Sequence, residues 1–222
     1  MFDNLDQLGV FCSECTKCSI SALHYDKLVC VGRGSYKAKL LLVAPIPIEN
    51  DNDTGYPLVG LSGVLLEKML ESVEIYREDY YISNIQKCTI SNDNEVNKEC
   101  AENCLPYLDE QIRLINPTII VCLGANVLHT LTGHKAKITQ DRGNIYSYKD
   151  RLYMLMYHPN YLLTHPTLEQ GKHRYMTWLD LIKLKKILDG DSIDSIQLKE
   201  KRQPKKKEQK QEKSETYDDI PF

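Results

Sequence analysis

Four short apolar runs, separated by longer stretches with helical spacing, constrain the fold of this chain more than any other feature. The runs cover residues 39–43, 80–84, 118–122 and 151–156. A continuous apolar run is typical of a strand buried on both faces, as the strands of parallel sheets are. Parallel strands need crossover helices that pack back on the sheet. The sequence therefore predicts an α/β fold, a three-layer sandwich around a central, mostly parallel four-stranded sheet.

The stretches between the runs supply the helices and the loops. Helical periodicity predicts one helix over residues 98–114 and a final amphipathic helix over 172–188. In open α/β sheets, ligands bind at the carboxyl ends of the strands. We therefore expect the functional site where the loops 45–60, 84–88 and 158–163 converge.

The last part of the chain differs in composition from the rest. From Lys199 to Lys213, eight residues are basic and three are acidic, with almost no apolar side chains. Such a segment cannot bury enough apolar surface to fold alone. We expect one folded domain over residues 1–189 and a disordered, charged tail over 190–222.

Composition also argues against several classes of protein. A formal net charge of −3 over 222 residues disfavours a uniformly basic nucleic-acid binder, although local patches can still hold phosphate. No apolar stretch approaches the ~20 residues that span a bilayer, and the N-terminus lacks the pattern of a signal peptide. We expect a cytoplasmic protein. Its eight cysteines should be reduced, which favours metal ligation or burial over disulfides.

Three cysteines near the N-terminus form two overlapping C-x-x-C pairs, Cys12 with Cys15 and Cys15 with Cys18. A C-x-x-C turn lets two thiolates bind one metal ion or cluster. Another cysteine, Cys88, follows the second apolar run, four residues after Asn84. This strand end therefore delivers a candidate base-reading amide and a candidate metal ligand together.

Several motifs occur in an order that resembles the iron-sulfur uracil-DNA glycosylases of family 4. In chain order they are Lys39-Leu-Leu-Leu-Val43, Thr54-Gly-Tyr-Pro-Leu-Val-Gly60, Tyr81-Ile-Ser-Asn-Ile-Gln-Lys-Cys88, Cys104, Ile119-Ile-Val-Cys-Leu-Gly124, Arg142-Gly143 and His158-Pro-Asn-Tyr-Leu-Leu163. The resemblance covers about residues 12–188. Many motifs in one order carry more weight than any single motif.

The resemblance implies a [4Fe-4S] cluster, bound in the family by one C-x-x-C pair and two later cysteines. The matching residues here are Cys15, Cys18, Cys88 and Cys104. Zinc bound by the same four thiolates is the alternative. The other cysteines are expected to be partly buried thiols, Cys12 and Cys100, or core residues, Cys30 and Cys122.

The resemblance also implies how a base would be bound and removed. Family members extract the base from the stack and cleave its glycosidic bond, while uracil leaves as an anion. Asn84 falls where the family's amide meets the uracil edge with one donor and one acceptor. His158 would donate to uracil O2 and stabilise the leaving charge. Helix capping before Pro159 is the alternative for His158. Asp51 falls where a second family carboxylate lies and would position water.

Three positions depart from the family pattern. The family's Gly-Glu-Gly/Ala-Pro-Gly loop after the first strand is Ala-Pro-Ile-Pro-Ile at residues 44–48, so that bulk replaces space and an acid. Leu58 stands where the family's aromatic ring stacks on uracil. Thr164 stands where an arginine binds phosphate. We expect these changes to weaken uracil binding and excision.

The chain terminus is similar to that of bacterial single-stranded-DNA-binding proteins, which docks replication and repair proteins. The matching residues are Asp218, Asp219, Ile220, Pro221 and Phe222. A solvated charged tail is the alternative. By this resemblance, we expect replication or repair proteins to dock at the tip.

Two functions are compatible with these observations. One is a uracil-DNA glycosylase-fold, iron-sulfur DNA-binding protein of replication or repair, which binds single-stranded or uracil-containing DNA with weak or absent excision. The other is an active uracil-DNA glycosylase of base excision repair. The replaced loop over residues 44–52 favours the first function.

Overall fold

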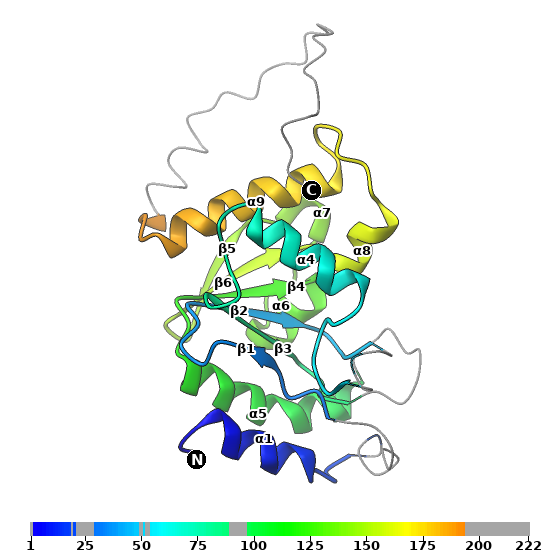
Figure 1. Ribbon diagram of the computed structural model, residues 1–222, viewed down its shortest axis with the longest axis vertical. Helices are drawn as coiled ribbons and strands as arrows, with labels where there is room; N and C mark the ends of the chain where they lie inside the picture. The colour runs from blue at the N-terminus through cyan, green and yellow to red at the C-terminus, as the bar shows by residue number, and fades with distance from the viewer. Residues whose placement is uncertain are drawn as a thin grey trace, which may run out of the picture.

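A single sheet with helices on both faces forms the body of the protein (Figure 1). The computed structural model describes residues 2–18, 20, 29–48, 51, 54–88 and 97–193. The expected three-layer α/β sandwich is confirmed, but the sheet has six strands instead of four. Of the tail expected over residues 190–222, residues 194–222, with the motif at 218–222, lie outside the described residues.

The strand order is β1-β3-β2-β4-β6-β5. Four central strands are parallel, β2 (Leu40–Ala44), β3 (Tyr80–Asn84), β4 (Ile119–Leu123) and β6 (Arg151–Met156). Two antiparallel strands form the edges, β1 (Arg33–Gly34) beside β3 and β5 (Ile145–Tyr148) beside β6. The four predicted strands are therefore the parallel ones, and the two additional strands lie at the edges.

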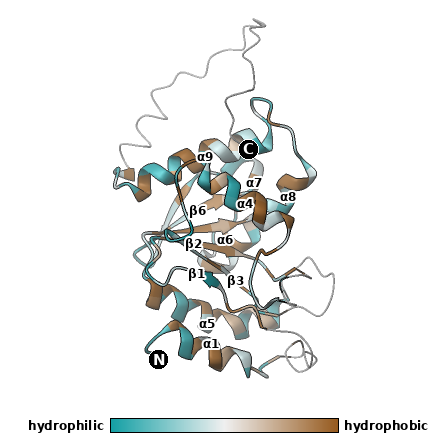
Figure 2. Cartoon of the chain, in the orientation of Figure 1, coloured by the Kyte–Doolittle hydropathy of each residue, from teal (hydrophilic) through white to brown (hydrophobic). Residues whose placement is uncertain are grey.

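Alternate side chains of the central strands enter two separate cores. Leu40 and Leu42 pack with apolar side chains of α4 (Leu61–Glu71) and α9 (His173–Leu188). Leu41 and Val43 pack with apolar side chains of the helices on the opposite face. Figure 2 shows central strands such as β2 in brown, the colour of hydrophobic residues, between helices of mixed colour, while the edge strand β1 is teal.

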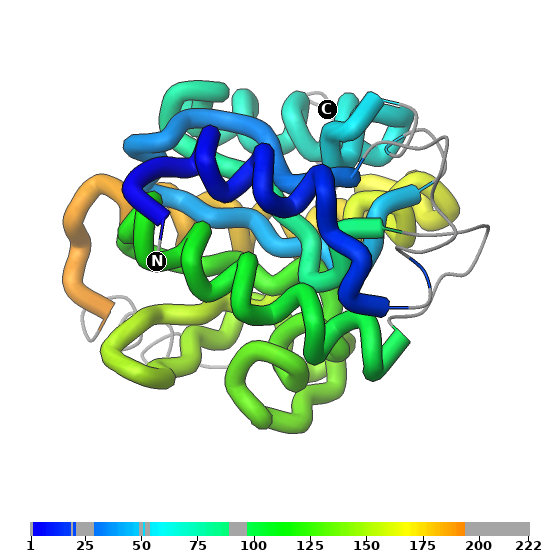
Figure 3. Tube along the Cα trace, turned by 90° about the horizontal axis from the view of Figure 1, so that it is seen from below, coloured from blue at the N-terminus to red at the C-terminus, as the bar shows by residue number. Residues whose placement is uncertain are grey.

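The second core is covered by α1 (Leu5–Ser13) and α5 (Lys98–Ile115), which lie side by side across that face in Figure 3. The Asn97 side chain caps α5 by accepting the backbone N–H of Cys100, 3.2 Å away. Asn116 ends the helix in the left-handed conformation, with φ at 50°, just before Pro117. This placement brings the cysteines of α5 to the end of the helix nearest the carboxyl end of β3.

Within the described residues, three shorter helices lie toward the C-terminal half of the chain. They are α6 (Ala125–Thr132), α7 (Ile138–Asp141) and α8 (Pro159–Thr164). Because α6 follows β4 directly and α8 follows β6 after two residues, both begin at the carboxyl edge of the sheet. In the described part of the chain, no helix is long and apolar enough to cross a membrane.

Candidate functional site

A cavity of about 600 Å³ lies at the carboxyl ends of β2, β4 and β6, the edge where the sequence places the ligand site. Its lining comes from the segments that follow these three strands: Pro45, Ile46, Ile48, Leu123, Gly124, Ala125, Asn126, Val127, His158, Asn160, Tyr161 and Thr164. Two of the three predicted loops therefore line it. The wall from β4 into α6 was not predicted, because its residues, apolar except for Asn126, form no motif that points to a ligand.

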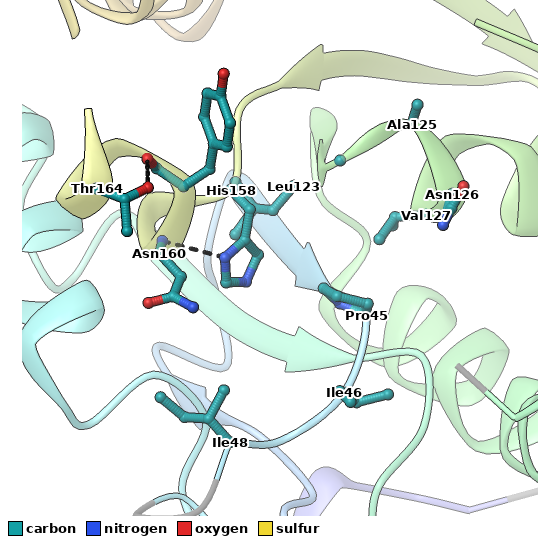
Figure 4. A pocket seen from close by; sticks show the side chains of 12 residues that line it. Pro45, Ile46, Ile48, Leu123, Ala125, Asn126, Val127, His158, Asn160 and Thr164 are labelled. Carbon is teal, nitrogen blue, oxygen red and sulfur yellow. Dashed lines mark hydrogen bonds between the residues drawn. The ribbon is translucent and has the colours of Figure 1, made fainter. Parts of the chain in front are cut away.

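His158 is the polar group best placed to act in this cavity. Its ring points into the space bounded by Pro45 and Asn160 (Figure 4). The Nδ1 atom accepts the backbone N–H of Asn160, 3.2 Å away, and so caps α8. Burial lowers the pKa of His158 to about 4. A neutral ring that accepts at Nδ1 carries its proton on Nε2. Capping and proton donation, the two predicted roles, are thus compatible in one tautomer.

Asn84 ends β3 as predicted, and its side chain is fully buried. Within the described residues, neither the amide oxygen nor the amide nitrogen has a hydrogen-bond partner. A buried amide without partners costs free energy, so such a group in a native protein calls for a ligand or water. Asn84 does not line the cavity. The loop after β2 lies alongside the segment that follows Asn84, since Gln86 N–H donates to the Pro45 carbonyl at 3.1 Å.

A buried lysine that the sequence analysis left without a role, Lys87, holds the segment between Asn84 and Cys88. Its ammonium donates to Ser83 Oγ at 2.6 Å, to the Asn84 carbonyl at 2.8 Å and to Gln111 Oε1 at 2.7 Å. These bonds tie the end of β3 to α5. Burial lowers the pKa of Lys87 to about 8, although neighbouring thiols act in the opposite direction. The sequence signal was a lysine three residues after the amide of an apolar strand.

The four cysteines matched to the family's cluster ligands come from three segments that converge. Burial, followed by the thiols of Cys104, Cys18 and Cys15, raises the pKa of Cys88 to about 12. Such mutual effects require short distances. Tyr107 of α5 also lies beside the first C-x-x-C pair, with its hydroxyl 3.5 Å from Cys15 Sγ. The α5 helix and the N-terminal segment thus meet at Cys15.

These thiols are the donors that an iron-sulfur cluster requires, so the residues present fit that group in their chemistry. In the part of the chain that the structure describes, however, no three His, Cys, Asp or Glu side chains are arranged to hold a metal ion. A fifth thiol, Cys100, forms a hydrogen bond with Cys18. Burial, followed by this hydrogen bond, raises the pKa of Cys100 to about 12. Cys12, Cys30 and Cys122 are buried, and burial raises the pKa of each.

A match to known proteins covers the sheet and the cavity but begins after the N-terminal cysteines. Residues 31–182 match the Uracil DNA glycosylase superfamily. The type-4 uracil-DNA glycosylase of Thermotoga maritima is 34% identical over 166 residues, 73% of this chain and 86% of that enzyme. The chain belongs to the type-4 uracil-DNA glycosylases.

Two further relatives place the similarity in context. The type-4 uracil-DNA glycosylase of Pyrobaculum aerophilum is 32% identical over 174 residues, 74% of this chain and 87% of that enzyme. A DNA polymerase of Bacillus phage SP01 is 30% identical over 167 residues, 74% of this chain but 17% of the polymerase. The family resemblance seen in the sequence is confirmed.

Within this type-4 fold, the Asp51 carboxylate accepts hydrogen bonds from the backbone of its own loop. One carboxylate oxygen accepts the Ile48 N–H at 3.1 Å, and the other accepts the Val59 N–H at 3.0 Å. The residue is 1% exposed and does not line the cavity. Asp51 thus organises the loop between β2 and α4.

The remaining departures from the type-4 pattern lie on either side of this loop. Leu58 packs in the core with α4 at a φ of 54° and does not line the cavity. Arg33 holds this turn by donating to the Pro57 and Leu58 carbonyls at 2.8 and 2.9 Å. Thr164 does line the cavity, but its hydroxyl donates to the Tyr161 carbonyl at 2.9 Å.

Proposed function

We propose that this protein recognises uracil in DNA and removes it slowly. The observation that supports the proposal is a difference in hydrogen bonding between two polar side chains, Asp51 and Asn84. Both oxygens of the Asp51 carboxylate are engaged by backbone N–H groups. The Asn84 amide, by contrast, has no partner among the described residues. Groups for reading the base are available, whereas the carboxylate that would position water is in use.

Recognition rests on Asn84 and His158. The Asn84 amide offers one donor and one acceptor, which complement the N3–H and O4 of uracil. His158 would donate from Nε2 to uracil O2. Because Asn84 is fully buried and Pro45 lies beside it, the base reaches the amide only when the loop after β2 shifts. That shift costs free energy and weakens binding.

Excision breaks the bond between C1′ of the sugar and N1 of uracil, and the electron pair of that bond passes to the base. The charge that develops on O2 is stabilised by the neutral His158 ring, which donates a hydrogen bond without releasing its proton. A water molecule then attacks C1′ and must lose a proton. A misplaced or missing general base typically costs ~10²-fold or more in rate. We expect this attack by water to limit the rate of excision.

A [4Fe-4S] cluster is the cofactor that we propose, with Cys15, Cys18, Cys88 and Cys104 as ligands. A bound cluster would join the N-terminal segment, the end of β3 and α5 covalently, and so stabilise the loops at that edge of the sheet. Cys88→Ser should bleach the absorption near ~400 nm that thiolate-bound iron gives. Cys122→Ser, in a strand of the core, is the control and should keep it. Stoichiometric zinc in place of iron would contradict the assignment.

The second candidate is a DNA-binding role in replication or repair with no excision. The similarity to a phage DNA polymerase supports it, because a related segment occurs in a protein named for DNA synthesis. The tip from Asp218 to Phe222, outside the described residues, would then dock a partner. Deletion of residues 220–222 should abolish capture by proteins that bind single-stranded-DNA-binding tails, without loss of folding. Unchanged capture would remove the docking role.

The test of the proposed function is one preparation examined for binding and for excision. Fluorescence anisotropy should show tighter binding of single-stranded DNA with one uracil than of the same strand with thymine. A single-turnover assay with the cluster intact should show slow excision from single- and double-stranded substrates. Equal affinity for both strands together with no excision would leave only the second candidate.

A further inference from the structure

Four aromatic rings pack together, from the residue after β6, from α8, from the residue after α8 and from the start of α9. Tyr157 and Tyr161 stack at 5.3 Å between centroids with an interplanar angle of 11°, and Tyr161 and His165 stack at 4.1 Å and 23°. His173 meets all three edge-on, at 5.0 to 5.2 Å. We call these four residues the ring cluster.

Hydrogen bonds fix the rings in this arrangement. His173 Nδ1 lies 3.0 Å from the Tyr157 hydroxyl, and His173 Nε2 lies 3.3 Å from the Tyr161 hydroxyl. His165 Nδ1 lies 2.9 Å from the Tyr161 carbonyl and 2.9 Å from Thr164 Oγ1. A ring held in this way loses little conformational freedom when a ligand packs on it.

The stack runs from the core to solvent beside the cavity. Tyr157 is 6% exposed, Tyr161 is 39% exposed, and His165 is exposed. Tyr161 and Thr164 line the cavity, and His165 is the next residue. The outer ring of an ordered stack therefore lies next to the mouth of the proposed uracil pocket.

A positive charge beside the ring cluster favours a polyanion. The exposed Lys172 directly precedes His173, whereas the Arg142 guanidinium is paired with the Asp180 carboxylate. Basic side chains beside stacked rings are the combination with which proteins hold the phosphates and bases of single-stranded nucleic acid.

We propose that Tyr161 and His165 form a base-stacking subsite for one nucleotide that directly flanks the uracil in DNA. The flanking base extends the stack on the outer ring, while the uracil occupies the cavity. The subsite supplies affinity that does not depend on base identity, since every base has a face that can stack. It offsets part of the binding lost through the apolar loop and through Thr164. This inference rests on the proposed function.

The experiment uses the full-length protein and four labelled single-stranded oligonucleotides. One carries uracil in a normal sequence, two carry uracil with an abasic analogue immediately 5′ or 3′ of it, and one carries thymine in place of uracil. Wild-type affinity should fall roughly 5- to 100-fold when the base on one flank is removed, and much less for the other flank. His165→Ala should remove this difference, whereas His165→Phe, which keeps a ring, should retain it.

His134→Ala is the matched control, because His134 is also an exposed histidine packed on a tyrosine, Tyr146 at 5.3 Å, but it does not line the cavity. It should behave as wild type. Equal losses in wild type and His165→Ala, or insensitivity of wild type to both flanks, would overturn the subsite. Flank-dependent binding without preference for uracil over thymine would uphold the subsite and contradict the proposed function.

Discussion

The two sides of the cavity differ in how their polar groups are used. On the α8 side, His158 caps the helix through Nδ1 and keeps Nε2–H for a ligand. On the β2 side, the wall is made of Pro45, Ile46 and Ile48, and the nearby carboxylate of Asp51 is bound to the backbone of its own loop. One side retains groups for charge stabilisation, and the other has become scaffold. Under the proposed function, this difference keeps base recognition and weakens the activation of water.

The largest expected effect comes from the two polar side chains that remain available for a base, His158 and Asn84. His158→Ala and Asn84→Ala should each lower the remaining single-turnover excision rate by roughly 10²- to 10³-fold, because each removes a hydrogen bond to the departing base. Asn126→Ala is the control, since this exposed amide lines the cavity from α6. If all three variants excise uracil at the wild-type rate, the α8 side is not where the chemistry occurs.

The pH dependence of stability tests the state of His158. Its pKa is lowered to about 4 in the folded protein, so the unfolded chain binds the proton more tightly. Its contribution is fully present above the unfolded pKa of ~6.5 and is lost as the pH falls toward 4, by about 3 kcal/mol in the free energy of unfolding. Denaturant unfolding of wild type and His158→Asn, which can still cap α8, should diverge in slope between pH 6.5 and 4. Parallel curves would show that the ring is not shielded from water.

A smaller effect is expected from the β2 side. Asp51→Asn should lower the free energy of unfolding by about 1–3 kcal/mol. The new NH₂ group is a donor and would face one of the two backbone N–H donors, so one hydrogen bond is lost. Excision by the folded protein should change little. Asp79→Asn, which alters a carboxylate that accepts the Tyr76 N–H at 2.9 Å, is the control for a similar loss away from the cavity. A rate loss of ~10²-fold or more with unchanged stability would instead make Asp51 the group that positions water.

The sequence predicted the parallel strands well because buried strands are continuous apolar runs. The bounds of β3 and β6 coincide with the predicted ones. The edge strand β5 escaped notice because Ile145–Tyr148 mixes apolar and polar residues on a partly exposed edge. The edge strand β1 covers only Arg33 and Gly34, which is too short for any periodicity. Edge strands carry weaker periodicity than central ones, so their absence from the prediction has a physical reason.

The site was predictable where a residue's role depends on its strand and unpredictable where it depends on the path of a loop. Asn84 and His158 sit at strand ends, so the motifs placed them correctly at the carboxyl edge. The two backbone donors to Asp51 lie three and eight residues away and meet only because the loop folds over. The role of Lys87 depends on the approach of Gln111 from α5. Spacing marks Lys87 as following the strand, but it does not predict its hydrogen-bond partner on α5.

The central claim is that the loop after β2 limits excision, and a loop replacement tests it most directly. Residues 44–48 would be changed from Ala-Pro-Ile-Pro-Ile to Gly-Glu-Ala-Pro-Gly, the family pattern, and single-turnover excision of uracil from single-stranded DNA measured beside wild type. We predict a rate increase of ~10²-fold or more, since space and a carboxylate are restored together. His158→Ala in the replaced loop background should abolish the gain. A wild-type rate that already equals or exceeds that of the well-folded replacement would contradict the account.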